Sequence, residues 1–177
     1  MIVLSLFLGV GCGGLFGGPN EQAADAIGQT NEAVAQHNRL FREARATYEE
    51  ARQALEAGKD PKEQAKRIAR TRETLRKARG SLEEARGPLS EVQGLAVENE
   101  IKDYTRILSE AMDVQLRAEA READFYAVLE GDPILENERR RALNILEEVD
   151  AEYGRAEEAY GRAQEIADSN PDLLRRS

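Results

Sequence analysis

The stretch IGQTNEAVAQHNRLFREARATYEEARQALEAGKDP, residues 27–61, decides the fold class of this chain. It carries an apolar or aromatic side chain at every seventh position: Ile27, Val34, Phe41, Tyr48 and Leu55. A seven-residue repeat places these side chains on one stripe of an α-helix, as in helices that pack along a shared seam. The stretch closes with Gly58, which is typical of a helix C-terminus, and with Asp60 and Pro61, which are typical of the next helix start.

The same repeat continues through the rest of the chain, and no alternation typical of strands interrupts it. Its members in the later segments are Ile68, Leu75, Leu82 and Leu89, then Val97, Tyr104, Ala111, Ala118 and Phe125, then Ala142, Val149, Ala156 and Ala163. We therefore predict an all-α fold over residues 21–170. The expected architecture is an elongated, antiparallel, coiled-coil-like bundle of three to four long helices joined by short Gly/Pro turns.

The turns are predicted from Gly, Pro and Asp. Asp60 is expected to cap the second helix, with Glu63 completing a capping box. Residues 131–133, Gly-Asp-Pro, repeat this pattern and are expected to end the third helix and begin the fourth at once. We expect the second turn at Gly87-Pro88, which is the stronger local signal. The alternatives are a kink at this pair, because the repeat runs on to Val92 and Ala96, and a turn near residues 94–99, which would give helices of nearly equal length.

Composition excludes several functions. One Cys and one His among 177 residues supply neither an intrachain disulfide nor the usual zinc or di-iron ligand sets, so no metal and no cofactor are expected. The net charge of −9 argues against general nucleic-acid binding. The sequence has no Gly-rich phosphate loop and no Gly-x-Ser-x-Gly elbow. We therefore predict a non-enzymatic protein with no catalytic residue.

His37 lies on the apolar stripe between Val34 and Phe41. We expect a partly buried seam residue there, with a pH sensor or a ligand as the alternative. Tyr153 and Tyr160, seven residues apart, are expected to mark a seam on the fourth helix.

Charge is uneven along the chain, with +5 over residues 59–87 and −3, −6 and −5 over residues 21–58, 88–130 and 131–177. We favour the interpretation that the basic helix pairs with its acidic neighbours; the alternative is a docking face for an anionic partner.

The N-terminus, MIVLSLFLGVGCGGLFGGPN, differs from the rest. An apolar run over residues 2–10 leads to Gly11 and the only cysteine, Cys12. This arrangement resembles the signal of bacterial lipoproteins, although Gly9 stands where Leu is usual and no basic residue precedes the run. The resemblance implies that residues 1–11 are a signal peptide, that cleavage falls between Gly11 and Cys12, and that Cys12 carries the lipid.

Residues 12–20 are then a Gly-rich tether and residues 171–177 a flexible tail. Because Gly13 is not Asp, the resemblance favours the outer membrane, facing the periplasm. Two acyl chains make such an anchor stable.

We therefore expect a lipid-anchored cell-envelope protein acting as a helical scaffold, spacer or adaptor. The alternative is a periplasmic binding module or assembly factor that presents a helical groove to a partner protein. That alternative predicts an exposed second apolar face on the third helix, formed by Ile107, Met112, Val114 and Leu116. Both hypotheses expect a protein partner or self-association, no nucleic acid, and membrane attachment through the lipid; cell-wall contact is compatible with either.

Overall fold

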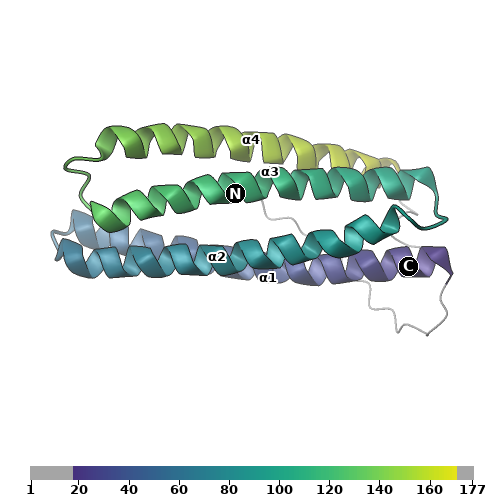
Figure 1. Ribbon diagram of the computed structural model, residues 1–177, viewed down its shortest axis with the longest axis horizontal. Coiled ribbons are helices and arrows are strands. Elements are labelled where there is room, and N and C mark those ends of the chain that lie inside the picture. The colour runs from purple at the N-terminus through teal and green to yellow at the C-terminus, as the bar shows by residue number, and fades with distance from the viewer. Residues whose placement is uncertain (1–17, 171–177) are drawn as a thin grey trace.

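The computed structural model describes residues 18–170, which form four long helices and no strand (Figure 1). The helices are α1 (Pro19–Glu56), α2 (Pro61–Val92), α3 (Asn99–Gly131) and α4 (Arg139–Ser169). The predicted all-α bundle is confirmed. The predicted signal peptide, Cys12 and the tail at 171–177 lie outside the described residues, and α1 begins inside the segment expected to be tether.

The helices pack in chain order, α1 on α2, α2 on α3 and α3 on α4. Figure 1 shows the result as two antiparallel hairpins laid side by side along one long axis. The start of α1 therefore lies at the same end as the α2–α3 connection. The turns after α1 and α3 lie together at the opposite end.

The core is long and thin, because many of the side chains at the helix contacts are alanine. Alanines at the helix contacts are almost completely buried, and this small side chain lets the backbones approach closely: Ala44, Ala51, Ala78, Ala85, Ala111, Ala118, Ala142 and Ala156. Larger apolar residues gather in two main clusters. One lies around Leu82, Leu108 and Met112, and the other around Leu75 and Phe125.

The first turn follows the prediction in most respects. Gly58 has a φ of 72°, a left-handed conformation that favours glycine, and the Asp60 side chain accepts a hydrogen bond from the backbone N–H of Lys62 at 3.0 Å. The capping box is wrong, because Glu63 instead pairs with Lys66 at 2.7 Å.

The expected turn at Gly87-Pro88 is wrong, because α2 continues through Pro88 to Val92. A proline inside a helix costs about 3 kcal/mol. Continuing the helix buries Leu89 and Val92, which are 1% and 0% exposed, and burial of such side chains contributes about 1.5–3 kcal/mol each. The packing of the seam therefore outweighs the local signal, and the nearly equal helices of the alternative are what forms.

The fourth helix does not begin directly after Asp132, as expected, but at Arg139. The Asp132 carboxylate instead accepts the backbone N–H groups of Glu136, Asn137 and Glu138 at 3.0, 2.7 and 3.0 Å. These hydrogen bonds lower the pKa of Asp132, and the one from the backbone N–H of Asn137 has the largest effect. The loop of residues 132–138 is thus organised by one side chain.

The exposed second apolar face expected on the third helix is not found. Met112 and Leu116 are buried at 0% and 8% exposure, and Ile107 and Val114 are partly buried against the same cluster.

Between residues 18 and 170, none of the helices combines the length and apolar character needed to cross a bilayer.

Candidate functional site

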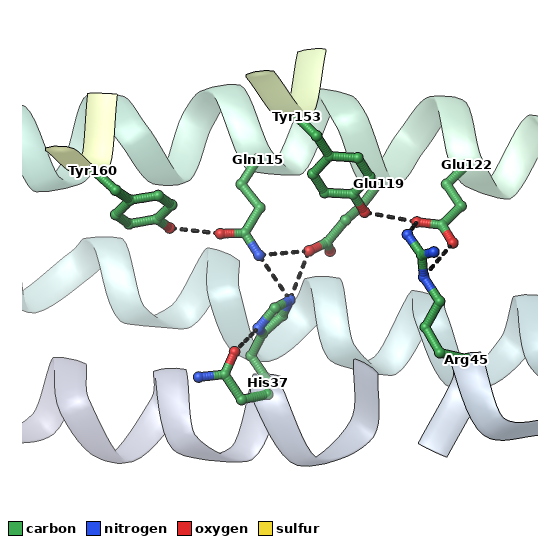
Figure 2. Close-up of polar contacts among 8 residues, drawn as sticks. His37, Arg45, Gln115, Glu119, Glu122, Tyr153 and Tyr160 are labelled. Carbon is green, nitrogen blue, oxygen red and sulfur yellow. Dashed lines mark hydrogen bonds and ion pairs between the residues drawn. The ribbon is translucent and has the colours of Figure 1, made fainter. Parts of the chain in front are cut away.

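A band of polar side chains lies between the two apolar clusters, and we call it the polar layer (Figure 2). It consists of His37 and Arg45 from α1, Gln115, Glu119, Glu122 and Tyr126 from α3, and Tyr153 and Tyr160 from α4. Positions on α3 show how it is placed: Leu116 belongs to one cluster and Phe125 to the other. Helix α2 faces this level with Ala78, which is 0% exposed and leaves room for the longer side chains.

The centre of the polar layer is a fully buried pair, His37 and Glu119, whose side chains are 1% and 0% exposed. His37 Nε2 lies 2.7 Å from Glu119 Oε1, and His37 Nδ1 lies 3.1 Å from Asn38 Oδ1. Both ring nitrogens therefore face oxygen acceptors, and the imidazole stacks on Phe41 at 5.6 Å between ring centroids. A nitrogen and an oxygen 2.7 Å apart need a proton between them, so a hydrogen bond joins His37 to Glu119.

The same Glu119 oxygen ends a chain of side-chain hydrogen bonds. Gln115 Nε2 donates to Glu119 Oε1 at 2.9 Å, and the Tyr160 hydroxyl donates to Gln115 Oε1 at 2.6 Å. Burial, followed by the charge of Glu119, raises the pKa of Tyr160, so this hydroxyl stays a donor. The second oxygen of Glu119 is buried and has no hydrogen-bond partner.

A second centre forms around Glu122, which accepts from three side chains. Arg45 Nε lies 2.9 Å from Oε1 and an Arg45 terminal nitrogen lies 3.1 Å from Oε2, a two-pronged contact. The Tyr126 hydroxyl donates to Oε1 and the Tyr153 hydroxyl to Oε2, each at 2.6 Å. Both oxygens of this buried carboxylate are therefore satisfied.

Electrostatics agree with that geometry. Burial, followed by the charge of Glu122, raises the pKa values of Tyr126 and Tyr153. Burial acts to lower the pKa of Arg45, but Glu122 and the tyrosines outweigh it and the pKa is raised. The Arg45 guanidinium also lies over the rings of Phe41 and Tyr153, at 5.1 and 5.9 Å from their centroids.

The polar layer can hold a proton and neutralise charge, and it ties α1, α3 and α4 together at one level. Because His37 and Glu119 are shielded from solvent, a dissolved substrate does not reach their atoms in this conformation. In the part of the chain that the structure describes, no three His, Cys, Asp or Glu side chains are grouped to hold a metal ion.

Of the residues singled out from sequence, Gly11 and Cys12 lie outside the described residues. His37 was expected to be partly buried and is instead fully buried, in contact with Glu119. Tyr153 and Tyr160 lie on a seam as predicted, with their hydroxyls in the polar layer. The acidic members on α3, Glu119 and Glu122, were missed.

The favoured interpretation of the basic helix is confirmed for part of it. Arg67 pairs with Glu50 of α1, and Arg72 and Arg86 pair with acidic residues of α3. Charge pairing therefore joins α2 to both of its neighbours. A surface hollow between α3 and α4 is also lined by charges, but its Arg121 already pairs with Asp124 and Glu148.

The chain matches no known family, no curated protein and no solved structure. Its function is therefore argued from its own residues.

Proposed function

We propose that this chain is a non-enzymatic, lipid-anchored protein of the bacterial cell envelope, and that its helical bundle acts as a scaffold, spacer or adaptor. Cys12 carries the proposal, because it follows an apolar run and a small residue and precedes a Gly-rich segment. Acyl chains on Cys12 would hold the protein at the outer membrane, facing the periplasm.

The form of the bundle supports this role. Helix α1 has 38 residues, which at 1.5 Å per residue span about 57 Å. It begins at Pro19, a short distance after Cys12, so the anchor would join one end of the rod. The turns after α1 and α3 would then face away from the membrane, where a partner could be held at a fixed distance.

The polar layer supports the same role in a different way. Buried polar residues favour one arrangement of the helices, because a shifted packing would leave their charges without partners. A spacer needs a defined length and a fixed helix register, and the contacts of His37 with Glu119 and of Arg45 with Glu122 stabilise both.

The test is metabolic labelling with a clickable fatty acid in cells that make the full chain. We expect label on the wild type and none on Cys12→Ala, which should also leave the membrane fraction. Ser5→Ala, inside the apolar run, is the matched control and should be labelled like the wild type. Equal labelling and equal membrane partitioning of Cys12→Ala would overturn the proposal.

A further inference from the structure

The outer face of α2 carries a row of basic side chains, which we call the basic stripe: Lys62, Lys66, Arg70 and Lys77. Their spacing of four, four and seven residues places them on one line of the helix. All four are exposed. Lys66 pairs with Glu63 within the helix, whereas Lys62, Arg70 and Lys77 form no ion pair with any described residue. Glu73 lies in the same row but pairs with Arg76.

The outer face of α4 carries the opposite charge in a row of similar length, which we call the acidic stripe: Glu147, Asp150, Glu157, Glu158 and Glu165. These carboxylates are exposed, and none of them takes part in an ion pair within residues 18–170. The arginines on or beside this face are Arg139 and Arg140 at the start of α4, Arg155, which pairs with Glu152, and Arg162.

One chain cannot bring its two stripes together. Helix α3 packs on both α2 and α4, and α2 and α4 are not packed against each other. Each stripe lies on the side of its helix away from the buried residues, and α3 separates α2 from α4 in Figure 1, so the two stripes face away from each other. The unpaired basic charges on α2 of one copy and the unpaired acidic charges on α4 of another copy are therefore complementary.

We propose that copies of this chain associate side by side, with the basic stripe of one copy against the acidic stripe of the next. Because the stripes lie on opposite sides, each added copy leaves one stripe of each sign free, so the assembly is a row or a ring and not a closed dimer. This inference deepens the scaffold role of the proposed function and rests on it.

A second copy fits the basic stripe better than an anionic membrane does. Lys62 follows the 57–60 turn, at the end of the bundle opposite to the start of α1. A membrane that holds the chain through Cys12 would meet the other end first. Helices α2 and α4 start at the same end of the bundle, and Arg70 and Asp150 lie at similar distances from those starts, so the two would lie at a similar height on neighbouring copies anchored in the same way.

The test is sedimentation velocity on the full chain, at fixed protein and detergent concentration. We expect association at about 0.01 M ionic strength, where charges act over about 30 Å, and its loss at about 1 M, where they act over about 3 Å. Arg70→Glu with Lys77→Glu should abolish association, and so should Asp150→Lys with Glu157→Lys. Matched controls on α1, Arg39→Glu with Arg42→Glu and Glu32→Lys with Glu43→Lys, should associate like the wild type.

The decisive experiment mixes the two charge-reversed variants. Each of them retains one unchanged stripe, and the unchanged stripes of the two variants have opposite charges. An equimolar mixture of the two should associate again, which also shows that both are folded. A monomeric wild type at low salt, reversed variants that still associate, or a mixture that does not recover would each overturn the proposal.

Vesicles of phosphatidylglycerol test whether an anionic membrane, and not a second copy of the chain, binds the basic stripe. If the wild type binds them through Arg70 and Lys77 but shows no self-association, the basic stripe is a membrane face and the proposal is wrong. Loss of fatty-acid labelling with intact association would instead refute the lipid anchor alone, so the two failures are distinguishable.

Discussion

Glu119 and Glu122 lie one turn apart on α3, and both are buried, at 0% and 4% exposure. Glu122 accepts hydrogen bonds on both oxygens, from Arg45, Tyr126 and Tyr153. Glu119 is contacted on one oxygen, by His37 and Gln115, and its other oxygen has no partner. The same side chain is thus buried in two different ways within one layer.

The two carboxylates differ in the side chain that contacts them, which is Arg45 for Glu122 and His37 for Glu119. The Arg45 guanidinium is always charged and is half exposed, so it satisfies Glu122 while keeping contact with water. His37 is fully buried and contacts Glu119 through one hydrogen bond of 2.7 Å, so this partner has no access to water. The Glu122 centre is therefore the more tolerant of change, and the His37–Glu119 pair should be the most sensitive point in the bundle.

The largest effect is expected from His37→Leu. This change removes the hydrogen bond between His37 and Glu119 and leaves the buried carboxylate with Gln115 as its remaining partner. Breaking a buried pair in this way costs about 3–5 kcal/mol. Urea denaturation at pH 7, followed by circular dichroism, should show the midpoint falling sharply.

The matched variant is His37→Leu with Glu119→Leu, in which both polar groups are gone. Replacing a whole buried pair by apolar side chains is often neutral or stabilising by about 1–4 kcal/mol. The double variant should therefore recover most of the lost stability. A double variant as unstable as the single one would show that packing at these positions, and not the unpaired charge, decides the result.

A smaller effect distinguishes the two carboxylates directly. Glu122→Gln loses the charged two-pronged contact with Arg45 and should cost about 1.5–3 kcal/mol. Glu119→Gln keeps an oxygen for His37 and Gln115 but places a buried amide NH2 where the carboxylate oxygen has no partner, so it should cost about 3 kcal/mol, more than Glu122→Gln. Equal losses in urea denaturation would contradict the contrast between the two centres.

Alkaline pH tests the tyrosine side of the Glu122 centre. The pKa values of Tyr126 and Tyr153 are raised in the folded chain, by burial and then by Glu122, above about 10 in the unfolded chain. Their contribution to the free energy of unfolding is therefore complete below about pH 10. It is lost as pH rises above that value, because the unfolded state then binds fewer protons than the folded state.

Each such tyrosine adds up to about 1.4 kcal/mol per pH unit to that loss. The free energy of unfolding, measured from pH 8 to pH 11, should therefore decline less steeply above about pH 10 in Tyr153→Phe than in the wild type. The control is Tyr104→Phe, whose pKa is raised by burial alone, and it should flatten the curve less. Identical slopes in wild type and Tyr153→Phe would refute the assignment.

The fold was largely predictable because the seven-residue repeat is a local signal that the packing reinforces. The failures came where tertiary contacts outweigh a local signal. Pro88 marks a helix end in isolation, yet burial of Leu89 and Val92 carries the helix past it. Asp132 resembles an N-cap, yet its carboxylate accepts N–H groups as far along as Glu138, so α4 starts later.

The polar layer was only partly predictable, although the sequence contains a signal for it. One heptad line on α3 begins with Ile101 and Leu108 and ends with Leu129, and between them stand Gln115 and Glu122. Two polar residues in an otherwise apolar line indicate a polar level in the core. Which side chains of α1 and α4 meet them depends on how the helices are placed against one another, and no local pattern contains that information.

The smallest effect concerns Asn38, whose side-chain oxygen lies 3.1 Å from His37 Nδ1 and is the other acceptor facing the imidazole. Asn38→Ala should cost about 0.5–1.5 kcal/mol, because a partly buried hydrogen bond is lost while the contact of His37 with Glu119 is kept. Asn38→Asp retains a side-chain oxygen for His37 Nδ1, so it should lose less stability than Asn38→Ala. If both variants lose the same stability in urea denaturation, the acceptor at residue 38 does not help to hold the imidazole, and Glu119 alone determines its position.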